Sequence, residues 1–185
     1  MIAVLAVVIV IVLRALLIQP FYIPSASMVP QLEVNDKIVV SRLSYRLHAP
    51  RRGDIVVFDR PPGAALDTGT IGNGHSPLRW VTERLGLVPR TDEFVKRVIA
   101  MPGETVEGHD GHVYIDGRLL VEPYLQPTVR TDPFAPRRVP AGQLWVMGDN
   151  RGDSEDSRYF GPIRRGTVVG RAFMKVWPVS NVSFL

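Results

Sequence analysis

Two serines one residue apart lie in a short segment that prolines bound on both sides, Pro24 to Pro30. Proline fixes its own φ angle and disfavours helical conformation in the residue before it, so we expect an extended or turned segment. Ser25 and Ser27 would then present their hydroxyls in defined directions. A serine is a weak nucleophile until a base accepts its proton, so the segment predicts a nucleophile only if a base lies nearby. The alternative is a linker between the preceding apolar run and a folded domain.

The best candidate for that base is Lys96, in the largely apolar run from Glu93 to Ile99. Alternation along a strand puts Lys96 on the same face as Phe94 and Val98. Apolar surroundings disfavour the ammonium form and lower the pKa of a lysine, which lets it accept a proton near neutral pH. The alternative is an edge-strand lysine whose stem covers apolar surface.

A third polar cluster runs from Gly148 to Gly161 and is dense in acidic residues. Its first positions alternate oxygen-bearing side chains, as a calcium-binding EF-hand loop does. No acidic residue closes the loop at the twelfth position, however, and no helical pattern flanks it, so we expect no metal ion there. Taken alone, the run predicts a solvated loop between strands.

The composition narrows the class of protein. The chain has 185 residues, a formal net charge of +4 and no cysteine, which excludes disulfides and thiolate chemistry. Its length suffices for one domain with a core of its own. The basic excess is small and spread along the chain, which argues against nucleic acid as a partner. The 16 glycines and 16 prolines favour a loop-rich β protein.

The chain begins with an apolar run that only Arg14 interrupts before residue 19. A helix of that length spans about 27 Å, close to a bilayer core of roughly 30 Å. We therefore predict a membrane anchor over residues 1–19, with Phe21 and Tyr22 near the interface. A cleaved signal peptide is the alternative, but the run lacks a basic start and a small-residue cleavage site.

The remainder, residues 20–185, predicts one β domain. Short β-branched runs bounded by turn residues indicate strands, and Asp116-Gly117 is a strong signal for a two-residue hairpin turn. We interpret residues 59–92 as a variable insertion with a short amphipathic helix at 76–88, and the proline-punctuated residues 122–140 as a loop. Many short strands indicate a sandwich or barrel-like fold. The expected strands are 37–40, 54–58, 94–100, 104–106, 112–115, 118–121, 143–147 and 168–176.

Together these segments resemble one family, the type I signal peptidases of bacteria. The resemblance rests on the proline-bounded serines, on Arg52 to Phe58, on Lys96 to Ile99 with Pro102-Gly103, and on Gly148 to Arg158, in that order behind an apolar anchor. It implies a mainly β fold, a signal-peptidase-type scaffold of short antiparallel strands behind one N-terminal transmembrane helix.

The resemblance also implies residue roles in a serine/lysine dyad. Ser27 would be the nucleophile and Lys96 its general base. The Ser27 backbone N–H and the Ser25 hydroxyl would form the oxyanion hole, and Ser154 would hydrogen-bond Lys96 and orient it. The neighbouring Asp153 stands where asparagine is frequent in the family, and we expect it to point to solvent. The side chains around the lysine stem would be Phe58, Phe94 and Val146, and structural ion pairs would involve Arg97, Asp149, Asp156 and Arg158.

The implied substrate is an exported pre-protein whose signal peptide is hydrolysed off without a metal or other cofactor. It would lie extended between residues 21–27 and 93–96, with the side chains one and three residues before the scissile bond in two apolar pockets. The domain would face away from the cytoplasm at the bilayer, as a monomer that binds no nucleic acid. The nearer pocket would be walled by Ile23, Met28, Leu32 and Phe94, and the farther by Phe21, Ile38, Val57 and Val95.

Two other functions remain open on the sequence. One is a membrane-anchored β-module that binds extended peptides along a sheet edge without catalysis. Such a module would not need Ser27, Lys96 and Ser154 together. The other is a self-cleaving serine/lysine protease of the repressor type, which lacks an N-terminal membrane span.

Overall fold

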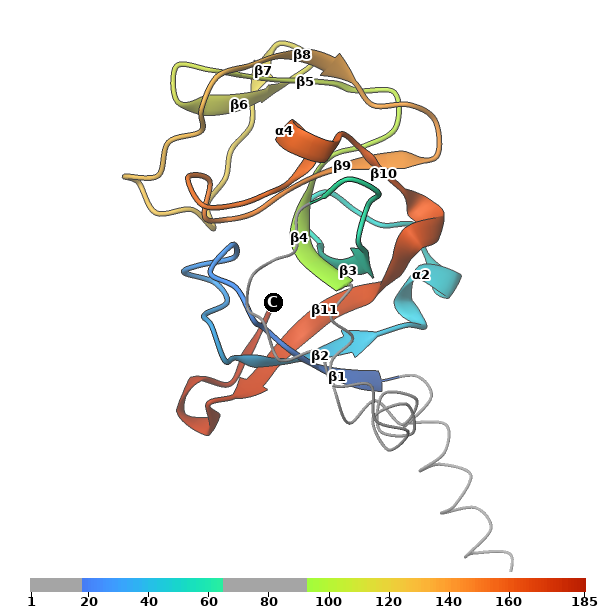
Figure 1. The fold of residues 1–185 in the computed structure, drawn as a ribbon, viewed down its shortest axis with the longest axis vertical. Coiled ribbons are helices and arrows are strands. Elements are labelled where there is room, and N and C mark those ends of the chain that lie inside the picture. The colour runs from blue at the N-terminus through green and yellow to red at the C-terminus, as the bar shows by residue number, and fades with distance from the viewer. Residues whose placement is uncertain (1–17, 65–92) are drawn as a thin grey trace, which may run out of the picture.

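The computed structural model describes residues 18–64 and 93–185, which form two antiparallel β-sheets (Figure 1). Most of the predicted anchor and of the insertion, including its predicted helix at 76–88, lies outside the described residues. Within the described ranges, no helix is long and apolar enough to cross a membrane. The mainly β character predicted from the sequence is confirmed.

The larger sheet has eight strands in the order β1-β2-β11-β3-β4-β9-β10, and β12 pairs with β11. The long strand β11 pairs with β2 on one edge and with β3 on the other, and both pairings contain register shifts. Strand β4 lies between β3 and β9. The strands are β1 (Ile18–Tyr22), β2 (Lys37–Ser41), β3 (Ile55–Asp59), β4 (Glu93–Ala100), β9 (Gln143–Met147), β10 (Ile163–Arg164), β11 (Val168–Trp177) and β12 (Ser183–Phe184).

The smaller sheet has four strands in the order β7-β6-β5-β8 and lies at the top of Figure 1. The predicted hairpin turn is formed by Asp116 (φ 50°) and Gly117 (φ 72°), the left-handed pair that a type I′ turn requires. The strands are β5 (Thr105–His109), β6 (His112–Ile115), β7 (Arg118–Leu119) and β8 (Phe134–Arg138). Within the described residues the short helices are α2 (Ser44–Leu47), α4 (Ser157–Phe160), η1 (Arg165–Thr167) and η2 (Val179–Asn181).

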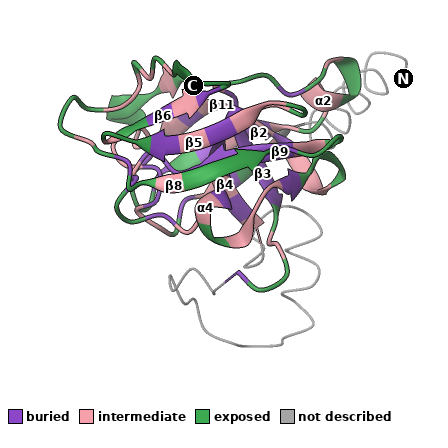
Figure 2. Ribbon diagram, turned by 90° about the horizontal axis from the view of Figure 1, so that it is seen from above, coloured by how far each residue is buried: buried purple, intermediate pink, exposed green. Residues whose placement is uncertain are grey.

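The centre of the larger sheet is buried on both faces. Along β3, Val56 and Phe58 pack into one apolar cluster, whereas Ile55 and Val57 pack into another. Burying an aliphatic or aromatic side chain of this kind contributes about 1.5–3 kcal/mol. Figure 2 shows β3 and β4 as buried and the outer strand β8 as exposed. Strand β4 is therefore a firmly packed support for any residue that it carries.

Two strands lie where the sequence predicted something else. Residues 18 and 19, predicted as the end of the anchor, begin β1, and the side chain of Phe21 is buried in the core of the domain. The physical reason is pairing of β1 with β2 along its whole length. In the predicted loop 122–140, residues 134–138 form β8, which among the described strands pairs with β5 alone. An edge strand tolerates Pro136 because one side of the strand needs no N–H partner. The predicted strands agree with the structure to within three residues at each end.

Candidate active site

Ser27 and Lys96, far apart in the sequence, meet in the structure. Lys96 Nζ donates a hydrogen bond to Ser27 Oγ at 2.6 Å. Ser27 is 6% exposed and Lys96 is 1% exposed. The serine lies on the loop between β1 and β2, and the lysine lies in the middle of β4. A hydroxyl and an amine at this distance can exchange a proton directly.

Lys96 projects from the face of β4 that also carries Phe94 and Val98. Both neighbours belong to a buried apolar cluster that includes Phe58 and Val146. The ring centre of Phe94 lies 5.4 Å from Lys96 Nζ. The apolar face predicted from strand alternation is therefore present, and such burial disfavours a charged ammonium.

The proline-bounded segment is turned, as its prolines predict. Val29 N donates to the Ala26 carbonyl at 3.1 Å, and Leu32 N donates to the Met28 carbonyl at 2.9 Å. Neither contact continues into a helix. The hydroxyl oxygens of Ser25 and Ser27 lie 3.3 Å apart, so the two serines present their side chains to the same region.

Ser154 is buried nearby, but it does not make the expected hydrogen bond to Lys96. Within the described part of the chain its Oγ has no hydrogen-bond partner. A Cβ placed on Gly148 would overlap both Ser154 Oγ and the Ser27 carbonyl oxygen. The Ser154 hydroxyl thus lies so close to the backbone of Gly148 that a residue with a side chain would not fit at position 148. Asp153 is exposed, as predicted.

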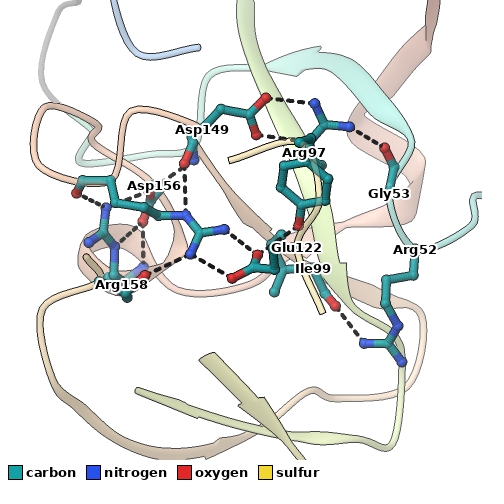
Figure 3. A network of polar contacts seen from close by, with 12 residues as sticks. Arg52, Gly53, Arg97, Ile99, Glu122, Asp149, Asp156 and Arg158 are labelled. Atoms are coloured by element: carbon teal, nitrogen blue, oxygen red, sulfur yellow. Dashed lines mark hydrogen bonds and ion pairs between the residues drawn. The ribbon is translucent and has the colours of Figure 1, made fainter. Parts of the chain in front are cut away.

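Two buried arginine–carboxylate pairs organise the loop that follows β9 (Figure 3). Arg97 of β4 donates from Nε and from Nη2 to Asp149 at 2.8 and 2.6 Å, and from Nη1 to the Gly53 carbonyl at 2.8 Å. Arg158 pairs with Asp156 at 2.9 Å. The first pair joins the loop to β4, whereas the second joins the end of the loop to helix α4. Both are bidentate, which fixes the geometry of each side chain.

A further buried cation, Arg151, was not singled out from the sequence. Its side chain is fully buried and pairs with Glu122. It also donates to Thr131 Oγ1 at 2.7 Å and to the Gly148 carbonyl at 3.1 Å. Glu122 and Thr131 belong to the long connection between β7 and β8. Both residues lie far from Arg151 in the sequence, so no local sequence pattern predicts this contact.

Tyr124 completes this network on the same connection. Its ring lies 4.0 Å from the guanidinium of Arg97, and its hydroxyl donates to Glu122 at 2.7 Å. Burial raises the pKa of Tyr124, and the adjacent Glu122 carboxylate raises it further. The hydroxyl therefore stays a neutral donor at physiological pH and supports the carboxylate that holds Arg151.

Of the eight residues predicted to wall the two substrate pockets, seven are buried in the core, and Val95 is partly buried against it. Seven of them form or pack against one cluster, whereas Phe94 faces the other cluster beside Lys96. Alternation along β4 explains the separation, because Phe94 and Val95 point to opposite faces of the sheet. The seven are Phe21, Ile23, Met28, Leu32, Ile38, Val57 and Val95.

The two buried carboxylates of the polar loop are each bound by an arginine instead of converging on a common point. Asp149 is bound by Arg97, and Asp156 is bound by Arg158. Throughout residues 18–64 and 93–185, no three histidine, aspartate or glutamate side chains are arranged to hold a metal ion. The chemistry that this site offers is that of a serine hydroxyl beside a buried amine.

Comparison with known proteins places this geometry in context. The family model described as signal peptidase, peptidase S26, matches residues 1–177. A probable signal peptidase I-2 of Synechocystis sp. is 38% identical over 97% of this chain and 72% of its own length. A signal peptidase I of Leptolyngbya laminosa is 39% identical over 94% of this chain and 75% of its own. A signal peptidase I of Mycobacterium tuberculosis is 38% identical over 97% of this chain and 71% of its own.

Proposed function

The chain belongs to the peptidase S26 family of signal peptidases, and from that premise we propose that it is a serine endopeptidase that removes N-terminal signal peptides from exported pre-proteins. The observation that carries the mechanism is the 2.6 Å contact between Lys96 Nζ and Ser27 Oγ in a buried site. Ser27 is the nucleophile and Lys96 is its base.

The reaction proceeds through an acyl-enzyme. Neutral Lys96 accepts the proton of Ser27 Oγ as the oxygen attacks the scissile carbonyl carbon. The Ser27 backbone N–H and the Ser25 hydroxyl donate hydrogen bonds to the oxyanion. Lys96, now an ammonium, gives its proton to the leaving amine as the peptide bond breaks. A water molecule then attacks the ester, passes a proton to Lys96 and releases the acyl product, and the proton returns to Ser27.

The support for Ser25 in this role is its position. Its Oγ lies 3.3 Å from Ser27 Oγ, so its hydroxyl is within reach of an oxygen that develops on the attacked carbonyl. The support for Ser154 as the residue that orients Lys96 is that its buried Oγ has no partner within the described residues, because a neutral lysine amine offers a lone pair to which a serine hydroxyl can donate.

We place residues 1–17 in the membrane and the β domain, from residue 18 onward, on its extracytoplasmic side, as a monomer. The support is the apolar N-terminal run, whose length matches a bilayer. The substrate's own apolar signal segment then lies in the same bilayer as the anchor. The peptide lies extended between residues 21–27 and 93–96 and presents small side chains to the apolar cluster behind them.

A peptide-binding module without catalysis is the second candidate. A buried serine hydroxyl bonded to a buried lysine favours the peptidase, because edge binding of a peptide uses backbone groups and needs neither side chain.

The test is cleavage of a pre-protein by the detergent-solubilised full chain. Wild type should release a mature protein with one new N-terminus, and Ser27→Ala should release none. Sequencing that N-terminus locates the scissile bond. Cleavage by the Ser27→Ala variant at the wild-type rate would contradict the proposed function.

A further inference from the structure

Asn150, in the loop after β9, reaches the backbone on both sides of the proposed nucleophile. Its side-chain Nδ2 donates to the Ala26 carbonyl at 3.2 Å, and its backbone N–H donates to the Ser27 carbonyl at 3.0 Å. The partner of the side chain is a carbonyl oxygen, so the amide must present its NH₂ group there. Two consecutive peptide groups of the nucleophile segment are thus held by one residue.

The first of these contacts acts on a specific peptide group. The carbonyl of Ala26 and the N–H of Ser27 belong to one planar amide, so fixing the carbonyl oxygen fixes the direction of the N–H. That N–H is the backbone donor of the proposed oxyanion hole. A hydrogen bond accepted by an amide oxygen also polarises the amide and strengthens its N–H as a donor. Ala26 O accepts a second hydrogen bond from Val29 N, which limits the effect of losing either one.

The loop that carries Asn150 is held in place on both sides of that residue. Gly148 packs so closely on the Ser27 carbonyl that a Cβ would overlap it. The buried guanidinium of Arg151 donates to the Gly148 carbonyl at 3.1 Å. Asn150 therefore projects from backbone that has little freedom to follow the nucleophile segment if that segment moves.

We propose that Asn150 is a positioning residue for the oxyanion hole, which aims and polarises the Ser27 N–H through the carbonyl of Ala26. The proposal rests on the proposed function of Ser27. It assigns Asn150 an effect on the tetrahedral intermediate that is larger than its effect on bound substrate. This difference separates a positioning role from a general role in folding of the loop.

The experiment compares two ligands on the full-length protein. A peptide aldehyde forms a tetrahedral adduct with Ser27 Oγ, whose oxygen occupies the oxyanion hole, whereas the matching peptide alcohol binds without forming a bond. In Asn150→Ala, the affinity for the aldehyde should fall about tenfold, the change expected for one hydrogen bond, and the affinity for the alcohol should stay within about twofold. The kcat value should fall to the same extent as the aldehyde affinity, with KM nearly unchanged.

Asn150→Asp keeps the size of the side chain, but its carboxylate cannot donate to Ala26 O. At the plateau of its pH profile it should therefore behave like Asn150→Ala. It replaces the alanine variant if that variant does not fold. Asp153→Asn is the matched control, because it changes an exposed residue of the same loop and should leave every value unchanged. Equal losses for aldehyde and alcohol, or a kcat within twofold of wild type, would overturn the inference. If the aldehyde does not modify wild-type Ser27, the proposed function itself has failed, and not only the role of Asn150.

Discussion

At the scale of single residues, replacing Lys96 by arginine tests whether the residue acts as a base or only as a positive charge. Lys96→Arg keeps a cation at the site, but arginine stays protonated at any working pH and cannot accept the proton of Ser27. We expect the rate of pre-protein cleavage to fall at least about 10²-fold, the lower range for loss of a general base. Lys37→Arg, on an exposed lysine, is the control and should cleave normally. Activity of Lys96→Arg within tenfold of wild type would remove Lys96 from the mechanism.

The same base predicts how activity depends on pH. Only the neutral amine can accept the serine proton, so a rise in pH, which removes the proton from the ammonium, should raise kcat/KM until the amine is fully neutral. Burial of Lys96 disfavours the ammonium and moves this rise toward neutral pH. Initial rates from pH 6 to 9, on protein shown to remain folded across that range, measure it. A flat profile would argue against the dyad.

Ser25 offers a test of the oxyanion hole by its hydroxyl alone. Ser25→Ala removes one donor and should lower kcat by about 10²–10³, whereas Ser25→Thr keeps the hydroxyl and should retain much of the activity. The contact between the two serine hydroxyl oxygens is the reason for expecting this difference. Steady-state kinetics of the two variants decide it. If both variants are equally active, Ser25 has only a structural role.

At the scale of elements, the sequence predicted the features that depend on residues close together in the chain, such as strand faces and hairpin turns. Alternation along β4 predicted the apolar face of Lys96, and Asp116-Gly117 predicted its hairpin. Strand β1 was missed because its apolar residues continue the run before them, and pairing with β2 is invisible in a single segment. The contact of Arg151 with Glu122 was missed because it depends on how a long connection returns to the sheet.

That connection should be a large source of stability for the site. Glu122→Ala leaves the fully buried Arg151 without its carboxylate, and breaking a buried pair in this way costs about 3–5 kcal/mol. Urea unfolding of the full chain in detergent measures the loss in the free energy of unfolding. Asp110→Asn is the control: it removes an exposed carboxylate beside His109 and should change the free energy of unfolding by less than about 1 kcal/mol. A similarly small change in Glu122→Ala would show that water or another group replaces the carboxylate.

At the scale of the whole molecule, the loop that follows β9 is attached both to the larger sheet and to the connection between β7 and β8 of the smaller sheet. Arg97 of the larger sheet binds Asp149 at the start of this loop. Glu122 and Thr131, from the connection between two strands of the smaller sheet, bind Arg151 two residues later. Figure 3 shows Arg97, Asp149 and Glu122 as parts of one polar network. The smaller sheet therefore contributes no residue to the dyad, but it holds the loop that contacts the nucleophile segment.

The arrangement of the whole domain also predicts which bonds are cut. A substrate that lies along residues 21–27 presents alternate side chains to the apolar cluster, whose members, including Ile23, Met28 and Ile38, are already packed together. A large side chain would have to displace this packing, at a cost of about 1–3 kcal/mol or more. Alanine or another small residue should therefore be required one and three residues before the scissile bond.

The measurement is a series of pre-proteins in which one position at a time is changed, with kcat/KM determined for each. Leucine or phenylalanine at either of the two positions should lower kcat/KM at least about tenfold. The reason is that displacing the packed side chains costs about 1–3 kcal/mol, and about 1.4 kcal/mol corresponds to a factor of ten. The position between them faces away from the protein and serves as the internal control, because its side chain should hardly matter. Efficient cleavage after leucine, or strong selectivity at the intervening position, would contradict an extended substrate packed against this cluster.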